Sequence, residues 1–273
     1  MLGSRRVVTG SDDRMLRVWD VESGQTLQVF EGHSDLVRAV AVLDSHRIVS
    51  GSFDATVRIW DVESGRVLRI LEGHSDGVRA VTVLGSSQVL SGSFDKTARV
   101  WDVESGQALQ ILNGHSDWVN AVAMLDSQKV VTGSEDETLW LWEVRRGEAG
   151  LQILQLKGHS DGVSAVAKLD RRRVVTGSDD RTLRVWDVKS GMVLQTLEGH
   201  SAGVRAVAVL DSRLVVSGSD DRTLRVWNIE SEKTLCTFTL DAPVTAVAVN
   251  PKSRLVVAGD SSGRVHFFDF VER

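Results

Sequence analysis

The sequence predicts an all-β chain made of repeated four-stranded antiparallel sheets, and three observations support this fold class. Short runs such as VRAVAVL at 37–43 alternate apolar and smaller residues with the two-residue period of strands. Only 2 of the 273 residues are proline whereas 24 are glycine, which favours short strands joined by tight turns. The chain also repeats itself, because Gly-His pairs begin at residues 32, 73, 114, 158 and 199.

One repeat, residues 32–72, shows the expected local structure. We expect strands over the ranges 37–43, 46–52, 56–62 and 66–71, with a tight turn at 53–55 and a second turn at 63–65. Four antiparallel strands cannot bury both faces of their own sheet. Stacking the sheets side by side covers these faces, and closing the stack into a ring leaves only short protected edges.

Tryptophans recur in register with the Gly-His pairs, at Trp19, Trp60, Trp101, Trp142, Trp186 and Trp227, and four of them precede an aspartate. A Gly-His pair, four strands and a Trp-Asp pair at this period resemble the WD-repeat β-propeller family. The resemblance covers essentially the whole chain and implies a seven-bladed β-propeller of four-stranded antiparallel blades in a single domain, 1–273. The blades are expected at about 1–31, 32–72, 73–113, 114–157, 158–198, 199–239 and 240–273.

Both terminal blades are expected to be incomplete. The first blade lacks its inner strand, and the last blade, with strands at 244–249, 254–259 and 264–270, lacks its outer strand. A competing interpretation uses 244–249 to complete the first blade, which gives six blades and leaves 254–270 as an overhang.

The resemblance implies a hydrogen-bonded set of four side chains in each complete blade: a loop histidine, a strand Ser or Thr, a turn aspartate and a strand tryptophan. The sets are His33, Ser50, Asp54, Trp60; His74, Ser91, Asp95, Trp101; His115, Thr132, Asp136, Trp142; His159, Thr176, Asp180, Trp186; and His200, Ser217, Asp221, Trp227. Ser, His and Asp together also suggest nucleophilic catalysis. Catalysis needs one preorganised site, however, and a buried indole N–H needs a partner, so we predict structural networks and no enzyme.

The sequence predicts neither a metal nor a cofactor. Each complete repeat holds a single Gly-His histidine, and Cys236 is the only cysteine, whereas structural zinc needs about four convergent ligands. The seventh blade departs from the pattern, because Ala258, Ser262 and Phe268 replace the Ser, Asp and Trp of the set. We therefore expect it to be the least rigid blade and to show the fastest amide exchange.

Binding is expected on the face that carries the loops between successive blades and the turns between the second and third strands, which we call the top face. Its loops vary between blades, whereas the strands are committed to packing. The slots of this face that hold aromatic, large apolar, basic or amide side chains predict a partner-binding site at Leu36, Arg38, Phe53, Arg79, Phe94, Trp118, Asn120 and Arg205. Aromatic and arginine enrichment is typical of interface cores. The competing interpretation is that the aromatic side chains fold over the blade tops as local packing.

The predicted function is a non-catalytic scaffold or substrate-recognition module that binds a protein or peptide. Two alternatives remain: a propeller that binds nucleic acid through its top-face arginines, and an enzyme that uses the central channel. The net charge of −5 argues against a dedicated nucleic-acid binder. The sequence contains no bilayer-spanning apolar run and no secretory signal, so we expect a cytoplasmic or nuclear protein without a membrane partner. Self-association through the incomplete terminal blades is left open.

Overall fold

The computed structural model describes residues 2–3, 5–145 and 147–270, and all regular structure within them is β-strand. The described part of the chain contains no helix with the length and hydropathy that a membrane crossing requires. Two compact units are present. The first unit comprises Met1–Thr132 with Trp142–Ile153, and the second comprises Gly133–Leu141 with Leu154–Arg273.

Three sheets lie wholly in the first unit. They consist of β1 (Arg6–Gly10), β2 (Leu16–Asp20) and β3 (Thr26–Phe30); β4 (Val37–Val42), β5 (Arg47–Ser52), β6 (Val57–Asp61) and β7 (Val67–Leu71); and β8 (Val78–Leu84), β9 (Gln88–Ser93), β10 (Thr97–Asp102) and β11 (Ala108–Asn113). The fourth sheet has the order β12 (Val119–Met124), β13 (Lys129–Ser134), β14 (Thr138–Glu143) and β15 (Leu151–Lys157).

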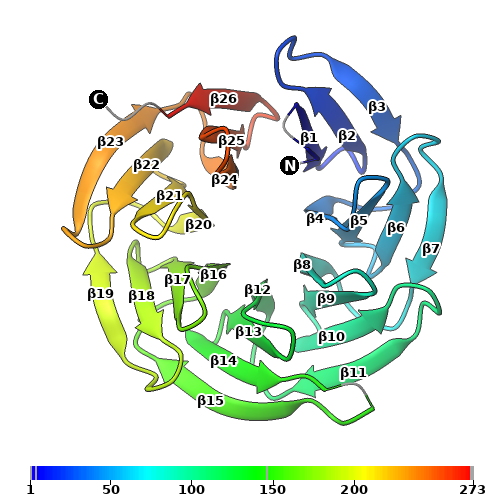
Figure 1. Cartoon of the computed structure of the whole chain (residues 1–273), viewed down its shortest axis with the longest axis horizontal. Helices are drawn as coiled ribbons and strands as arrows, with labels where there is room; N and C mark the ends of the chain where they lie inside the picture. Colours follow the sequence, from blue (N-terminus) through cyan, green and yellow to red (C-terminus); the bar gives the residue numbers. More distant parts are fainter. Residues whose placement is uncertain (1, 4, 146, 271–273) are drawn as a thin grey trace. The chain divides into compact units, whose positions relative to one another are not determined.

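Three further sheets lie in the second unit. They consist of β16 (Val163–Lys168), β17 (Arg173–Ser178), β18 (Leu183–Asp187) and β19 (Val193–Leu197); β20 (Val204–Val209), β21 (Leu214–Ser219), β22 (Thr223–Asn228) and β23 (Lys233–Thr239); and β24 (Val244–Asn250), β25 (Leu255–Asp260) and β26 (Val265–Asp269). Strands that are neighbours in the sequence are also neighbours in each sheet (Figure 1).

The strand count of every blade is as predicted: five sheets have four strands, while the first and last have three. The alternative with six blades is wrong, because β24 pairs with β25 in the last sheet, from Val244↔Asp260 to Asn250↔Leu255. The physical reason is local. A hairpin between consecutive strands closes a short loop, whereas pairing with the first blade would close a loop of most of the chain.

Glycine on the second strand of a sheet allows the next sheet to approach closely. A Cβ atom at Gly51 of β5 would lie only 2.6 Å from Cγ1 of Val78, which begins β8. The same contact joins Gly177 of β17 to Val204 of β20, again at 2.6 Å. These valines are fully buried, so a side chain at the glycine position would push the sheets of one unit apart.

Candidate functional site

Each complete blade contains a buried polar network, and the set around His74 illustrates the geometry. Nδ1 of His74 lies 2.7 Å from Oδ2 of Asp95, and Nε2 lies 2.7 Å from Oγ of Ser91. The indole N–H of Trp101 donates to the same Ser91 oxygen at 2.8 Å. A carboxylate can only accept, so Nδ1 carries the imidazole proton and Nε2 accepts the proton of the Ser91 hydroxyl.

Equivalent contacts recur along the chain. The Nδ1 atoms of three further histidines lie 2.6–2.8 Å from the turn aspartates, in the pairs His33 with Asp54, His159 with Asp180 and His200 with Asp221. Their Nε2 atoms lie 2.7 Å from the hydroxyl oxygens of Ser50, Thr176 and Ser217, respectively. These hydroxyl oxygens accept from the indole N–H groups of Trp60, Trp186 and Trp227. In the fourth blade, His115 and Trp142 both meet Oγ1 of Thr132, and Asp136 accepts from the backbone and hydroxyl of Thr138. The first blade retains the bond from Trp19 to Thr9.

The turn aspartate connects two loops of one sheet. In the second blade, Oδ2 of Asp54 accepts from the His33 ring and from the Ser34 backbone, while Oδ1 accepts from the backbone and hydroxyl of Thr56. Burial works against the charged form, but these hydrogen bonds outweigh it and hold the pKa of Asp54 well below its usual value. The carboxylate is therefore ionised at neutral pH.

Burial also favours the neutral form of two histidines. The pKa of His74 is lowered because desolvation opposes the imidazolium ion more strongly than Asp95 supports it. The same balance lowers the pKa of His200, whose partner Asp221 has a pKa of about 2. Both rings are thus neutral above their lowered pKa values.

The network is built for structure and does not resemble a nucleophilic site. Ser91 and Thr132 are fully buried, and each hydroxyl oxygen already accepts an indole N–H at the position where a substrate would have to approach. Among residues 2–3, 5–145 and 147–270, no three His, Cys, Asp or Glu side chains converge as metal ligands.

Three aromatic side chains of the first unit form a continuous row. The ring of Phe53 lies 5.0 Å from that of Phe94, and Phe94 lies 4.4 Å from Trp118, centroid to centroid. Backbone bonds fix the first two, since Phe53 N donates to Leu36 O and Phe94 N donates to Gly77 O, each at 2.9 Å. A Cβ atom at Gly77 would lie 3.0 Å from Phe53, so glycine makes room for the row.

Two arginines border this row. The guanidinium of Arg38 lies 5.0 Å from the centre of the Phe53 ring, and that of Arg79 lies 5.9 Å from the centre of Phe94. Nη1 of Arg38 also pairs with Asp12 at 3.0 Å. Trp118 remains 44 % exposed. We call Leu36, Arg38, Phe53, Arg79, Phe94 and Trp118 together the aromatic patch.

Two residues of the predicted binding site, Asn120 and Arg205, do not belong to the aromatic patch. Asn120 is only 6 % exposed, so the structure buries this residue of the predicted partner-binding site. It lies at the start of β12, where the strand has already entered the packed interior. Arg205 lies in the second unit between two carboxylates, 2.9 Å from Asp179 and 2.7 Å from Asp220, which neutralise its charge.

The seventh blade holds a polar network that sequence reasoning missed. Asp260 occupies the slot that is serine in the other blades, such as Ser219. Its Oδ2 lies 2.8 Å from Nε2 of His266, and its Oδ1 accepts from Ser262 and from the backbone of Arg264. Although burial opposes it, these bonds lower the pKa of Asp260 to about 2. The aspartate in a position that is serine in the other blades was the sequence signal for this network.

We expect the amides of β26 to exchange with solvent faster than those of β10, β18 and β22, even with this network in place. Among the described strands β26 pairs only with β25, whereas the other three strands are paired on both sides. Hydrogen exchange followed by mass spectrometry measures this difference. Equal protection of the four strands would show that the sequence and the pairing pattern both mislead about rigidity.

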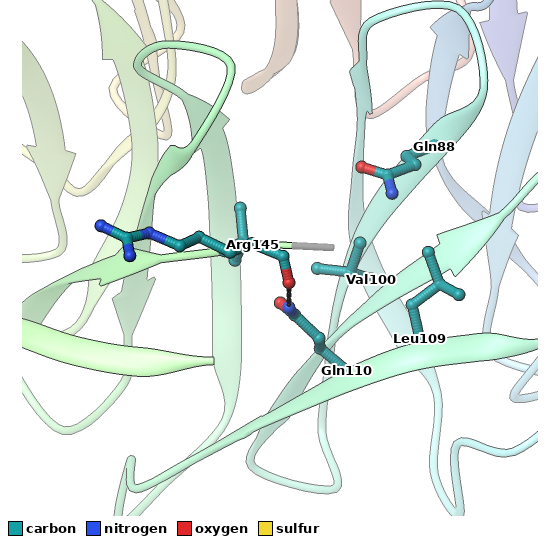
Figure 2. Close-up of a pocket in the computed structure, with 6 residues that line it drawn as sticks. Gln88, Val100, Leu109, Gln110 and Arg145 are labelled. Carbon is teal, nitrogen blue, oxygen red and sulfur yellow. Dashed lines mark hydrogen bonds between the residues drawn. The ribbon is translucent and has the colours of Figure 1, made fainter. Parts of the chain in front are cut away.

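A second missed residue is Gln110 of β11, which anchors the loop after β14. The Gly-His pairs at 114 and 158 are 44 residues apart instead of 41, and the three extra residues fall in this loop. Nε2 of Gln110 donates to Arg145 O (Figure 2) and also to Glu148 O. Val100, Leu109 and Val144 line a small recess beside Gln110, with a volume of about 10 Å³. Oε1 of Gln110 is buried there and has no hydrogen-bond partner among the residues that the structure describes.

Comparisons with known proteins agree with this construction. The family model for the WD domain, G-beta repeat, matches residues 3–20, 24–61 and 65–102, and the model for the WDR41 β-propeller matches residues 107–263, which is more than half of the chain. A segment of 37 residues is 46 % identical to the WD repeat-containing protein pop1 of Schizosaccharomyces pombe (strain 972 / ATCC 24843). That segment is 14 % of this chain and 5 % of pop1.

A solved structure is similar over the whole chain. The crystal structure of the WD40 β-propeller domain of Doa1 matches with a TM-score of 0.89 and 26 % sequence identity, covering 100 % of this chain and 91 % of the other. The fold class predicted from the repeats, a seven-bladed β-propeller, is therefore confirmed.

Proposed function

This chain belongs to the WDR41 β-propeller family and carries WD40 repeats, and we propose that it is a non-enzymatic scaffold that binds a protein or peptide on the aromatic patch. WD40 propellers serve in general as protein-interaction scaffolds. The observation that carries the finer proposal is the row of contacting rings of Phe53, Phe94 and Trp118, which ends in a half-exposed indole.

The composition of the patch supports a protein partner. Aromatic and arginine side chains dominate the binding energy of protein interfaces, because they bury large rigid surfaces at a small cost in conformational entropy. Tilted contacts with the neighbouring rings hold Phe94 in place before any partner arrives. A preorganised surface of this kind loses little freedom on binding.

The arginines favour a protein over a nucleic acid. Arg38 is paired with Asp12, and Arg205 is held by Asp179 and Asp220, so both charges are already compensated within the chain. Nucleic-acid binding depends on cations that neutralise phosphates and release counterions. A partner whose binding weakens by orders of magnitude between low and moderate salt would favour the nucleic-acid alternative.

The test replaces Phe53, Phe94 and Trp118 by alanine and compares quantitative capture of partners by the variant and by the wild-type chain. We expect binding to fall at least about tenfold, because each truncated hot-spot side chain costs more than about 1 kcal/mol. The urea midpoint of the variant should stay close to that of the wild-type chain.

The matched control removes apolar surface of similar exposure from β7 of the same unit, by Leu68→Ala and Ile70→Ala. This control should retain full binding. Wild-type capture by the triple variant would refute the site. Collapse of its stability would instead show that the aromatic row is local packing.

A further inference from the structure

The fifth blade departs from the repeat at one end of its sheet, and each departure adds positive charge. The turn between β16 and β17 lies beside the turn between β18 and β19, because Val188 N donates to Arg172 O at 2.9 Å. Lys168 ends β16, Arg171 lies in the first of these turns, and Lys189 lies in the second. All three residues are exposed. Three exposed cations thus lie at one end of a single sheet.

The other complete blades have different residues at these three positions. The residues equivalent to Lys168 are Val42, Val83, Met124 and Val209. Those equivalent to Arg171 are Ser45, Ser86, Ser127 and Ser212, and those equivalent to Lys189 are Glu63, Glu104, Arg145 and Glu230. The common architecture of the blade therefore does not need cations here, and their concentration in one blade points to a role other than folding.

Two carboxylates lie in the same turns, and both are already engaged. Nε of Arg173 donates to Oδ2 of Asp170, and Nε of Arg172 donates to Oδ2 of Asp187, each at 2.7 Å. Each carboxylate also accepts two backbone N–H groups of its own turn. Within the described part of the chain, the three cations that depart from the repeat form no ion pair. Their charges are therefore available to an anionic ligand.

We call Lys168, Arg171, Arg172 and Lys189 the basic cluster, and we propose that it binds a short acidic segment of a partner protein. Arg172 belongs to the cluster because its side chain remains 64 % exposed beside Asp187. Ammonium and guanidinium groups pair with carboxylates, and a guanidinium can hold one carboxylate through two hydrogen bonds. This surface shares no residue with the aromatic patch and does not depend on it.

The surroundings of the basic cluster favour a short segment over a long polyanion. β20 packs beside β16, and the turns at the same end of the sixth sheet hold Asp211, Glu230 and Glu232. These carboxylates oppose an anion that extends beyond the fifth blade. A sheet of four strands is about 14 Å wide, which about five residues of extended chain span. The partner segment should therefore carry its carboxylates within about five residues.

The probe is the peptide GGEEEEEGG with a fluorophore at its N-terminus, and its binding to the full chain is measured by fluorescence anisotropy. We expect it to bind at least about tenfold more tightly than the control peptide GGQQQQQGG, because only the probe carries carboxylates. Its affinity should fall as the salt concentration rises, since exposed charge pairs are screened.

A chain variant that restores the repeat tests the cluster. Lys168→Val, Arg171→Ser and Lys189→Glu together introduce the residues that the sixth blade holds at these positions, so the variant should fold like the wild-type chain. It should bind the probe at least about tenfold more weakly. If it does not fold, Arg171→Ser alone and the comparison of the two peptides on the wild-type chain still decide.

The matched control variant is Arg181→Glu with Arg222→Glu, which changes the net charge by the same amount. Both residues lie in turns at the opposite end of their sheets, and both are exposed. The fourth blade holds Glu137 at this position with the same positive φ, so glutamate fits the turn. This control should bind the probe within about twofold of the wild-type chain, because distant exposed charges are screened.

Three outcomes overturn the proposal. The first is equal affinity of the wild-type chain for the acidic and the glutamine peptide, and the second is wild-type affinity of the repeat-restoring variant. The third is tighter binding of a single-stranded oligothymidylate of the same charge, which would assign the cluster to a nucleic acid. The Phe53, Phe94 and Trp118 variant should bind the probe normally, so failure of one site is distinguishable from failure of the other.

Discussion

Replacement of Trp101 by alanine is expected to lower the free energy of unfolding by about 3–5 kcal/mol. The indole is 0 % exposed and packs in a cluster with Val57, Leu71 and Val103, so its removal leaves a cavity in a closely packed interior. The substitution also removes the N–H that donates to Ser91, and the hydroxyl of Ser91 loses one of its two partners. Urea unfolding followed by circular dichroism measures the change.

Trp118→Ala is the matched control, since the same atoms are removed from a side chain that is 44 % exposed. Its effect on unfolding should be no more than about 1 kcal/mol, although it lies on the surface proposed to bind a partner. This pair of results would assign Trp101 to the stability of the fold and Trp118 to binding. Equal destabilisation by the two substitutions would contradict that assignment.

The family resemblance implied the contents of each network, and local hairpins bring its members together in the structure. Ser91 and Trp101 lie on adjacent strands, and the loop that holds His74 packs over the turn that holds Asp95. Once the repeat fixes the strands, these contacts need no information from distant parts of the chain. The strand count of the terminal blades was predictable for the same reason.

Contacts between neighbouring sheets were harder to predict. The repeat places Arg205 in the same slot as Arg38, but only the structure shows that Asp179 of the preceding sheet and Asp220 of its own sheet enclose it. The burial of Asn120 is of the same kind. Such features depend on the separation and rotation of adjacent sheets, which a repeat period does not specify.

Departures from the repeat carried information that sequence reasoning did not use. The wider spacing of the Gly-His pairs around the fourth repeat marks an insertion, but it does not show that Gln110 of the preceding sheet binds two carbonyls of that loop. Asp260 was visible as an aspartate in a serine slot. A carboxylate there can accept several turn N–H groups, and this explains the replacement network in a blade that lacks the usual tryptophan.

Acid is expected to destabilise the fold from about pH 6.5 downwards. The reason is that histidines and aspartates of the networks stay unprotonated in the folded chain at pH values where the unfolded chain binds protons. The pKa values of His74 and His200 are lowered by burial, whereas unfolded histidine titrates near 6.5. Between that value and the lowered folded pKa, only the unfolded state is protonated. Each histidine therefore contributes a loss of up to about 1.4 kcal/mol per pH unit as the pH falls.

The aspartates act in the same direction at lower pH. Hydrogen bonds overcome burial and hold the pKa of Asp95 well below its usual value, and they lower that of Asp221 to about 2. A lowered carboxyl pKa stabilises the fold above the unfolded value near 3.9, and this stabilisation is lost as the pH falls towards the folded value. Loss of stability should therefore begin with the histidines and continue with the aspartates.

Urea midpoints measured at pH 7.5, 5.5 and 4.5 test this sequence of events. His74→Gln should be less stable than the wild-type chain at pH 7.5, by about 1–3 kcal/mol, because Ser91 and Asp95 each lose a partner. Its stability should also fall less steeply between pH 7.5 and 5.5. The control His46→Gln changes a histidine whose side chain is 68 % exposed, and it should reproduce the wild-type profile.

The repeat makes this acid response larger than any single network could produce. His74 and His200 belong to separate networks that share no residue, so their proton linkages should add. A wild-type midpoint that is constant from pH 7.5 to 5.5 would mean that the buried rings are protonated in the folded chain. The chain of donors from Trp101 through Ser91 and His74 to Asp95 would then be assigned the wrong direction.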